Sequence, residues 1–416
     1  MRTEYDVIIV GAGPAGCTAA ILLASAGWSV ALIEKQLFPR RKVCGACIGA
    51  GNLALLSTLG IGNEFARLAG PELRQVALYC GDRVVHAALP AAPLTRHPWG
   101  RALGREAFDL LLLERARVLG ASLWQPWSVR AVEGSAGAFR CRVGKRAAPD
   151  TILRAPVLIM ANGSWEGDPG GGRRVARRAG DLFAFKASFH RSRMAAGVLP
   201  VISFAGGYGG LVIADNGELT LAGCIRRDAL RVCRAAAPGQ TAGEAFENHL
   251  CASTAALRDA LAGARRQGAW LGIGPIRPGI HAPWRRADGR FMIGNAAAEA
   301  HPIIGEGISM AMQSAWLLCA GLIAAGLSSA SADALRRVGR EYDRQWRRAF
   351  ASRLHLAATL AHLAMRPRLA PIVWPLITRA PWLMTAMARG AGKARLPPAF
   401  RGVLPWDALA SLEDAN

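Results

Sequence analysis

The first 34 residues alternate between apolar runs and a glycine-rich turn. Residues 7–10 form a continuous apolar run, which is typical of a strand buried on both faces. A Gly-x-Gly-x-x-Gly turn follows, apolar residues then recur at helical spacing over 19–26, and a second apolar run over 30–33 ends at Glu34. The pattern predicts a strand, a tight turn, a helix and a second strand.

Period-two alternation of apolar and polar residues dominates the middle of the chain. Residues 74–88 alternate in this way, and residues 181–189 place three phenylalanines on one face and smaller or polar side chains on the other. The sequence Asp-Asn-Gly-Glu at 215–218 predicts a hairpin turn. We therefore expect residues 181–285 to form a mostly antiparallel sheet, with a helix over 242–261.

Longer elements surround this sheet region. Residues 101–114 have the pattern of an amphipathic helix, residues 124–143 that of a strand pair, and residues 151–160 that of one buried strand. Residues 307–332 carry no charge and are long enough to span a membrane. Because Gln313 and five serines dilute this segment, we expect a buried core helix instead.

Composition fits a folded protein with a large core, since 52% of the residues are hydrophobic. Lys and Arg number 51 against 29 acidic residues, but no basic run is interleaved with aromatics, so we expect no nucleic-acid partner. Nine cysteines without a disulfide-scaffold pattern fit a reducing compartment. The chain begins almost at once on a strand, which leaves no room for a signal sequence and predicts a cytoplasmic protein.

The basic residues gather near the C-terminus. Residues 344–406 contain no acidic residue and eleven Lys or Arg among Leu, Ile, Met and Trp. Four prolines divide residues 354–387 into helices too short to span a bilayer. We expect this region to cap the substrate entrance and to contact lipid peripherally, at the inner face of the cell membrane, or an acidic carrier protein. The alternative is an ordinary packing element.

The glycine turn has the chemistry of a dinucleotide site. Gly11 allows the tight turn, Gly13 lets the backbone approach a pyrophosphate, and Gly16 lets the helix pack closely on the sheet. The N–H groups at the helix start face the phosphates, and Glu34 stands where a carboxylate accepts hydrogen bonds from a ribose. With its flanking strands and helix, the turn predicts a bound dinucleotide.

Four stretches together resemble the FAD-dependent oxidoreductases of the p-hydroxybenzoate hydroxylase fold, in the branch of geranylgeranyl reductases, flavin halogenases and related monooxygenases. They are the glycine motif with Glu34, the Phe-Pro-Arg-Arg-Lys-Val-Cys-Gly loop at 38–45, the helix with Arg105, and the Gly-Asn segment that runs from 294 to 308. The resemblance implies an α/β fold: a Rossmann-type FAD-binding domain, an inserted mostly antiparallel β-sheet substrate domain and a helical C-terminal tail.

The patterns and the resemblance together divide the chain into six segments. The FAD-binding domain takes residues 1–73, 101–180 and 286–332, the substrate domain takes residues 74–100 and 181–285, and the basic apolar helical region takes residues 333–416. The glycine-rich stretch 167–180 is the expected boundary between the FAD-binding segment 101–180 and the substrate-domain segment 181–285.

The resemblance also implies roles around the flavin. Pro302 is similar to the proline that lies against the isoalloxazine, and Gly305 and Gly307 offer N–H groups to the flavin pyrimidine oxygen. Asn295 replaces the acid that binds the ribityl chain in relatives, and it can still accept a hydrogen bond. Arg105 resembles an arginine that reaches the phosphate or ribityl region; the alternative is a solvated helix arginine. The expected cofactor residues are Gly11, Gly13, Ala15, Gly16, Glu34, Lys35, Cys44, Gly45, Arg105, Gly294, Asn295, Pro302, Gly305, Gly307 and Ile308.

The Cys44-Gly-Ala-Cys47 sequence has two interpretations. It is a redox disulfide that passes electrons to flavin, or it is a flavin-side loop like that of the geranylgeranyl reductases. Disulfide reductases carry a second Gly-x-Gly-x-x-Gly domain, which we do not find here, so we favour the flavin-side loop. No second ligand pair accompanies the two cysteines, and we expect no metal.

Three residues are catalytic candidates: Cys44, Lys186 and His301. Lys186 lies on the polar side of the alternating strand, where it either holds an anionic substrate or activated halogen over the flavin, or faces solvent. Halogenases have their lysine earlier in the chain. His301, next to Pro302, is either a proton donor near the flavin or a hydrogen-bonded structural histidine.

We therefore expect an FAD enzyme that uses NAD(P)H as external reductant and hydroxylates an apolar aromatic or polyketide-like substrate, either a free hydrophobic small molecule or a carrier-bound one. The second hypothesis is reduction of prenyl or polyene double bonds, and the third is halogenation. A non-catalytic escort protein on the same fold, of the Rab escort type, is the alternative outside enzymology; a colourless protein that does not take up FAD would indicate it.

Overall fold

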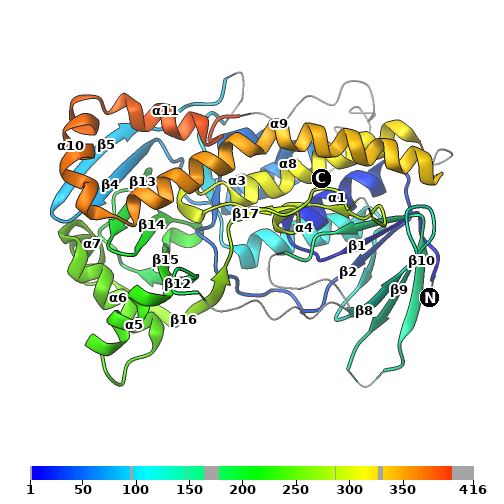
Figure 1. Cartoon of the computed structure of the whole chain (residues 1–416), viewed down its shortest axis with the longest axis horizontal. Coiled ribbons are helices and arrows are strands. Elements are labelled where there is room, and N and C mark those ends of the chain that lie inside the picture. Colours follow the sequence, from blue (N-terminus) through cyan, green and yellow to red (C-terminus); the bar gives the residue numbers. More distant parts are fainter. Residues whose placement is uncertain are drawn as a thin grey trace.

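A computed structural model of the chain describes residues 2–93, 97–146, 148–163, 178–285, 287–326 and 331–395. Its two main sheets lie at opposite ends, and helices run between them (Figure 1). The predicted boundary at 167–180 lies largely outside the described residues. The architecture confirms the predicted α/β fold with a Rossmann-type part, a mostly antiparallel sheet and C-terminal helices.

The N-terminal sheet has five parallel strands. Their order is β18 (Phe291–Met292), β11 (Val157–Met160), β1 (Val7–Val10), β2 (Val30–Ile33) and β7 (Ser122–Trp124). Later strands extend the sheet on both sides of β1, so its carboxyl end is the topological switch point where α/β proteins bind ligands. Three helices pack together against this sheet: α1 (Pro14–Ser25), α4 (Arg105–Val118) and α8 (Gly307–Ala325).

A small antiparallel sheet joins this unit. It consists of β8 (Ser128–Glu133), β9 (Phe139–Gly144) and β10 (Thr151–Ala155). The predicted single strand over 151–160 is wrong, because β10 ends before Pro156 and β11 begins after it in the five-stranded sheet. Proline cannot donate to a strand ladder, which makes it a natural point for the chain to change sheets.

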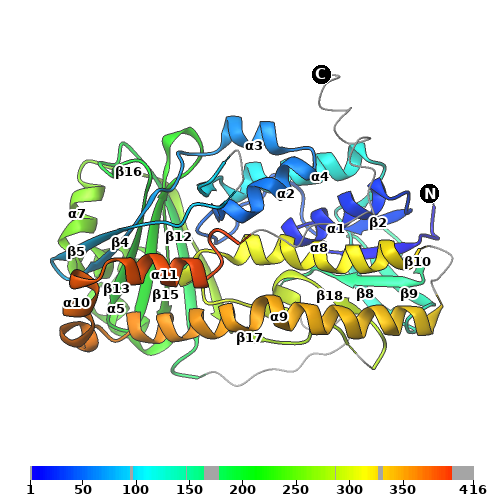
Figure 2. The same cartoon turned by 90° about the horizontal axis from the view of Figure 1, so that it is seen from above.

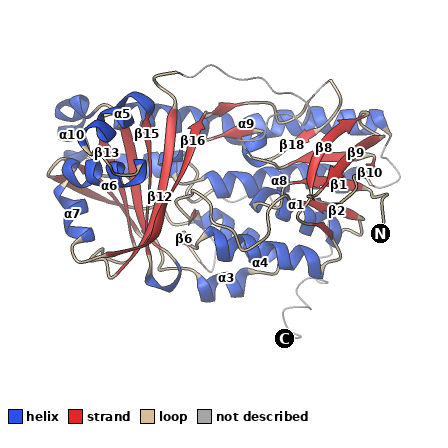
Figure 3. Cartoon of the chain, turned by 90° about the horizontal axis from the view of Figure 1, so that it is seen from below, coloured by secondary structure: helices blue, strands red, loops and turns tan. Residues whose placement is uncertain are grey.

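The second large sheet has seven strands (Figure 3). Their order is β16 (Arg265–Ile276), β12 (Leu182–His190), β15 (Leu219–Arg226), β14 (Gly207–Ile213), β13 (Val198–Phe204), β4 (Gln75–Cys80) and β5 (Arg83–Ala88). Every neighbouring pair is antiparallel except β13 and β4. Strands from two distant parts of the sequence therefore share one sheet.

Helices cover the outer face of this sheet. They are α5 (Arg227–Ala236), α6 (Ala242–Ser253) and α7 (Ala255–Leu261). Phe185 stacks on Phe246 of α6 with ring centroids 5.2 Å apart, and both side chains are buried in the core under these helices. The predicted single helix over 242–261 is interrupted at Thr254, whose backbone is extended. The hairpin turn at 215–218 becomes a short 3-10 turn, with Asn216 at a φ of 55°.

The C-terminal region begins with the 33-residue helix α9 (Ala332–Ala364). It runs beside α8 and continues past the seven-stranded sheet (Figure 2). The Tyr342 hydroxyl donates to the Met292 carbonyl at one end, and the Ser203 hydroxyl donates to the Ala364 carbonyl at the other. Helix α9 is thereby tied to both parts of the molecule.

Two short helices follow, α10 (Ala370–Arg379) and α11 (Trp382–Gly390). The expectation that all four prolines separate helices is wrong for two of them: Pro371 lies in the first turn of α10 and Pro375 lies inside it. A first-turn proline loses no helical hydrogen bond, since that N–H has no partner in the helix.

Helix α8 is, among the described residues, the one helix long and apolar enough to cross a membrane. In the folded chain, however, 67% of its most apolar 18-residue window is buried. It packs against α1 and α9, as we expected of a core helix. The remaining short elements are β3 (Cys47–Ile48), α2 (Leu53–Thr58), α3 (Gly62–Leu68), β6 (Arg101–Ala102), β17 (Gly279–Ile280) and β19 (Ala298–Glu299).

Candidate functional site

A cavity of about 630 Å³ connects the two large sheets. It extends from the carboxyl ends of β1 and β2 to the inner face of the seven-stranded sheet. This volume lies within the range of about 300–1,000 Å³ that is common for small-molecule and cofactor sites. Fourteen of the fifteen predicted cofactor residues line it: Gly11, Gly13, Ala15, Glu34, Lys35, Cys44, Gly45, Arg105, Gly294, Asn295, Pro302, Gly305, Gly307 and Ile308.

The glycine turn shapes one end of the cavity. A Cβ on Gly11 would lie 2.5 Å from the Ala161 carbonyl oxygen, and its φ of +105° disfavours any other residue. A Cβ on Gly16 would collide with the Gly11 carbonyl. Gly13 differs, since its Cβ would meet only the Arg105 Nη2 atom, at 3.8 Å. Gly11 and Gly16 are needed for packing, whereas Gly13 keeps the backbone open toward the cavity.

Glu34 is buried at the end of β2, with 3% of its surface exposed. Its Oε2 atom accepts from the Ala12 N–H at 3.0 Å, and its Oε1 atom accepts from the Gln36 N–H at 2.9 Å and from Arg40 Nη1 at 3.1 Å. A carboxylate has about four acceptor positions, so one remains for a ribose hydroxyl. Sequence analysis missed Arg40, whose partner lies six residues earlier.

Arg105 is held in place by a neighbouring carboxylate one helical turn along α4. Its Nε atom donates to Asp109 Oδ1 at 2.6 Å and its Nη2 atom donates to Asp109 Oδ2 at 2.7 Å. Only 14% of the Arg105 side chain and 1% of the Asp109 side chain are exposed. The alternative of a solvated helix arginine is therefore wrong, and the guanidinium lies beside Gly13.

Further cations surround this end. Lys35, Arg40, Lys42 and Arg105 all line the cavity, against the acidic Glu34. Burial lowers the pKa of Lys42, and the nearby Arg40 and Arg105 lower it further. Helix α1 begins here with no side-chain cap, so its first N–H groups have no side-chain acceptor. This combination suits a diphosphate.

The start of α8 forms a second part of the cavity wall, away from the glycine turn. This helix also has no side-chain cap, and a Cβ on Gly307 would meet nothing within 4 Å. The Gly294 N–H donates to the Ser314 hydroxyl at 2.9 Å, which fixes the loop before the helix. Two uncapped helix starts therefore face one cavity, as expected for a cofactor with a diphosphate at one end and a ring that gains negative charge at the other.

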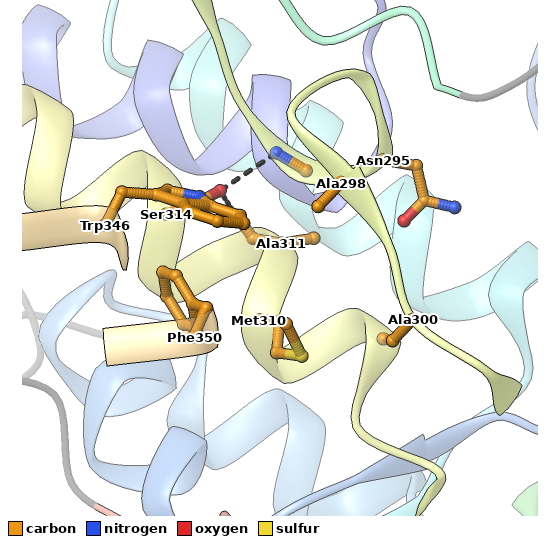
Figure 4. Close-up of a pocket in the computed structure, with 10 residues that line it drawn as sticks. Asn295, Ala298, Ala300, Met310, Ala311, Ser314, Trp346 and Phe350 are labelled. Carbon is orange, nitrogen blue, oxygen red and sulfur yellow. Dashed lines mark hydrogen bonds between the residues drawn. The ribbon is translucent and has the colours of Figure 1, made fainter. Parts of the chain in front are cut away.

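The loop from Gly294 to Ala300 is backed by a tightly packed layer. Behind it lies a second cavity of only about 10 Å³ (Figure 4), about enough for one water molecule. Trp346 and Phe350 of α9 line it together with Met310 and Ser314 of α8. The loop thus has little room to move away from the large cavity.

Cys44 and Cys47 both line the large cavity as free thiols. Burial raises the pKa of Cys47 to about 11. A thiol with so high a pKa is a poor nucleophile at neutral pH, because the thiolate is the reactive form. The raised pKa argues against the redox pair, and the flavin-side loop stays a prediction.

Tyr208 and His301 form a buried pair beside the flavin-ring end. The Tyr208 hydroxyl lies 3.2 Å from His301 Nδ1, and both residues line the cavity. Burial, together with the nearby His362, lowers the pKa of His301 to about 4. Burial also raises the pKa of Tyr208. Both groups are neutral at pH 7, so the pair can hold or pass a proton without becoming charged.

Sequence analysis proposed His301 but missed Tyr208. The alternation of β14 could have placed Tyr208 on the inner face of the sheet, but 93 residues separate it from His301. The ring of the exposed His362 on α9 lies 5.9 Å from the His301 ring. Only the folded chain brings these three side chains together.

Lys186 lies on the inner face of the seven-stranded sheet. Its register partner on β15 is Ala222, which in turn pairs with Gly210, and both of these line the cavity. Only 8% of Lys186 is exposed, so the alternative of a solvent-facing lysine is wrong. Lys186 does not itself line the cavity, which leaves its contact with a substrate a prediction.

The sheet end of the cavity is mostly apolar. Leu199, Val201 and Val212 line it from β13 and β14, and Ile273 and Ile276 line it from β16. Gly210, which pairs with Ala222 on the inner face, leaves space above the sheet because it has no side chain. A flat apolar molecule fits this wall better than a charged one.

Comparison with known proteins agrees with this geometry. The family profile described as "FAD binding domain" matches residues 4–353. Menaquinone reductase of Mycolicibacterium smegmatis is 27% identical over 420 residues, which cover 94% of this chain and 92% of that protein. The solved structure of the flavin-dependent brominase Bmp2 superimposes with a TM-score of 0.74, at 18% identity, over 99% of both chains. The last likeness shows a shared fold.

Other curated relatives match over a shorter stretch. Squalene epoxidase 4 of Arabidopsis thaliana is 28% identical over 164 residues, which cover 38% of this chain and 31% of that protein. The chain thus spans about a third of the length of this relative.

Proposed function

Because this chain belongs to the FAD-dependent oxidoreductases that carry the FAD binding domain, we propose that it is a monooxygenase that hydroxylates an apolar aromatic substrate. The observation that carries the proposal is the single cavity that joins two uncapped helix starts to an apolar sheet face. Such a site would hold a flavin ring next to a substrate and keep water away from both. The squalene epoxidases among the partial relatives support oxygenation.

The residues of the chain have distinct tasks in this proposal. The first N–H groups of α1 and the Arg105 guanidinium hold the diphosphate, and Glu34 accepts from the ribose. The first N–H groups of α8, at Gly307 and Ile308, line the cavity and would stabilise negative charge on a bound flavin ring. When bound, FAD supplies the redox chemistry, with NAD(P)H as the external reductant.

The inner face of the seven-stranded sheet orients the substrate and keeps the site dry. Leu199, Val201 and Val212 present the apolar surface, and Tyr208 presents a neutral hydroxyl. The Tyr208–His301 pair can take a proton from a phenol or give one to a product at the Tyr208 oxygen.

A product assay with labelled dioxygen tests this reaction. Purified protein with FAD and NAD(P)H is supplied with a panel of apolar phenols and prenylated quinones. Hydroxylation predicts product that carries one labelled oxygen atom. A panel that yields only hydrogen peroxide, with no labelled oxygen in any organic product, would contradict it.

The second candidate is reduction of a carbon–carbon double bond. The menaquinone reductase that matches 94% of the chain favours it, and the Tyr208–His301 pair could supply the proton that accompanies hydride transfer. Under anaerobic conditions this reaction predicts a prenylated quinone that has gained two hydrogens. The same panel with added bromide examines halogenation, the third candidate.

We also propose that the C-terminal helices touch an anionic lipid surface. Ile372, Leu376 and Trp382 are 75%, 58% and 66% exposed, and Arg368 and Arg379 lie on the same short segment. Exposed aliphatic and Trp side chains beside arginines have the composition of an interfacial helix.

Vesicle co-sedimentation tests the lipid contact. Serine at Ile372, Leu376 and Trp382 together should abolish binding to anionic vesicles and leave FAD binding unchanged. Equal binding by this variant and the natural chain would contradict the proposal, and capture of an acidic carrier protein instead would replace it.

A further inference from the structure

A fully buried carboxylate lies directly behind the flavin-ring end of the cavity. Glu306 stands between Gly305 and Gly307, both of which line the cavity, and none of its surface is exposed. It immediately precedes α8, at the N-cap position, but its side chain does not cap the helix. It turns instead toward the loop at Gly49, whose added Cβ would lie 2.7 Å from Glu306 Oε1.

The cation that pairs with this carboxylate comes from the far end of the described chain. Lys393 follows α11, and its Nζ atom lies 3.0 Å from Glu306 Oε1. The same ammonium donates to the Gly305 carbonyl at 3.3 Å. Only 9% of Lys393 is exposed. One side chain therefore contacts two successive residues of the loop that borders the cavity.

A polar network holds the C-terminal segment in this position. Gln313 of α8 donates to the Arg395 carbonyl at 3.4 Å and to Asn52 Oδ1 at 2.7 Å. Arg353 of α9 donates to Gln313 Oε1 at 3.0 Å. A Cβ on Gly392 would lie 2.9 Å from the Arg353 guanidinium, so this guanidinium packs directly on the segment. The segment is built into the core of the cofactor domain.

The charges explain why the contact matters for a flavin. Burial lowers the pKa of Lys393, but the Glu306 carboxylate and Cys47 together outweigh burial and the net pKa is raised, so the ammonium stays charged. An unpaired Glu306 would place a negative charge at the start of α8, where the helix dipole otherwise favours an anion. Reduced flavin accumulates negative charge at this place, so the pair keeps the helix start attractive to it.

We propose that Lys393 is a positioning residue of the flavin site: the C-terminal segment completes the ring end of the site by neutralising Glu306. The inference rests on FAD binding by this family and not on which substrate reaction follows. It assigns a cofactor-tuning role to a residue that lies outside the stretch matched by the FAD-binding family profile, which ends at 353.

The test measures FAD affinity by fluorescence titration of the apoprotein, and the flavin midpoint potential by spectroelectrochemistry. In Lys393→Met the unpaired carboxylate should weaken FAD binding at least about tenfold and make the potential more negative. In Glu306→Gln the unpaired ammonium should shift the potential in the opposite direction. The double variant Glu306→Gln/Lys393→Met should return toward the natural potential, and Lys393→Arg should preserve both quantities. Arg389→Met, which removes an exposed cation of the same segment, is the control and should change neither.

Two results would overturn the proposal. One is an unchanged affinity and potential in Lys393→Met. The other is that Lys393→Met and Glu306→Gln shift the flavin potential in the same direction and the double variant shows the sum of the two shifts. That result would make the pair a packing contact only. If Lys393→Met does not fold, Glu306→Gln still decides the matter, because the proposal predicts a less negative potential in that variant and an unchanged potential would overturn it.

Discussion

The two helix starts that face the cavity perform similar tasks but are built in different ways. Helix α1 begins in a turn whose glycines and whose carboxylate, Glu34, all lie within residues 11–34, and Gly11 also packs against the distant Ala161. Helix α8 begins in a loop fixed by Ser314, by Gly49 and by Lys393, which lies 88 residues beyond Gly305. The first start depends on local sequence, whereas the second depends on the whole fold. Four predictions probe this difference.

The largest effect should come from Gly11→Ala at the start of α1. The added Cβ lies 2.5 Å from the Ala161 carbonyl at a φ of +105°, so collision and backbone strain should together destabilise the apoprotein by roughly 3 kcal/mol or more. Urea unfolding of the apoprotein measures this. Gly27→Ala is the control, since its φ is +84° but its Cβ meets nothing within 4 Å. Equal losses in the two variants would show that the collision contributes nothing.

The next effect concerns pH at the second helix start. The folded pKa of His301 is about 4, below the unfolded value of about 6.5. As pH falls from about 6.5 to 4, the unfolded chain binds the proton first, so up to about 3 kcal/mol of stability is lost over this range. His301→Asn should flatten this part of the curve, measured by urea unfolding at several pH values. A variant of the exposed His355 should keep the slope; a slope unchanged in His301→Asn would exclude His301 as its source.

A matched pair of substitutions compares the two helix starts directly. Gly13→Ala and Gly307→Ala add a Cβ that meets only Arg105 Nη2 at 3.8 Å and nothing within 4 Å, respectively. Both apoproteins should therefore stay within about 1 kcal/mol of the natural stability. FAD affinity, measured by fluorescence quenching, should fall about tenfold or more in each, because the added methyl group occupies space next to the helix N–H groups. Natural affinity in either variant would mean that the cofactor does not approach that helix.

The smallest effect should come from the thiols beside the second helix start. Cys47 has a pKa raised to about 11 by burial, so a thiolate is rare at neutral pH. Cys44→Ser and Cys47→Ser should each change the rate of flavin reduction by NAD(P)H less than about twofold, measured by stopped-flow absorbance. Loss of reduction in both variants would restore the redox-pair interpretation.

The sequence predicts almost all of the part of the site that is proposed to bind the diphosphate. The strand, turn and helix around Gly11 and the acidic end of the second strand at Glu34 are contiguous, and local periodicity predicts them. The alternation over 181–189 likewise predicts which side of β12 faces the cavity. The structure adds burial, which local pattern does not determine: Lys186 lies on the predicted side but is buried rather than solvated.

At the start of α8, by contrast, local sequence patterns do not predict which residues contact the loop. The motif from Gly294 to Ile308 marks the loop, but its partners Tyr208 and Lys393 stand far from it in sequence. A buried ion pair gives no periodic signal, and Lys393 lies in a segment whose composition predicts a surface element. Its role follows only from the tertiary contact with Glu306.

Helix α9 has a mechanical consequence for turnover. Tyr342, in the first half of this 33-residue helix, bonds to the cofactor domain, and its last residue, Ala364, accepts a hydrogen bond from Ser203 of the seven-stranded sheet. A helix bound to both halves in this way resists hinge bending between them. We therefore expect a bulky ligand to enter through smaller displacements, in the loop over 35–46 or in the short helices after α9. We therefore expect ligand exchange to proceed through local motion of these segments and not through a rearrangement of the two halves.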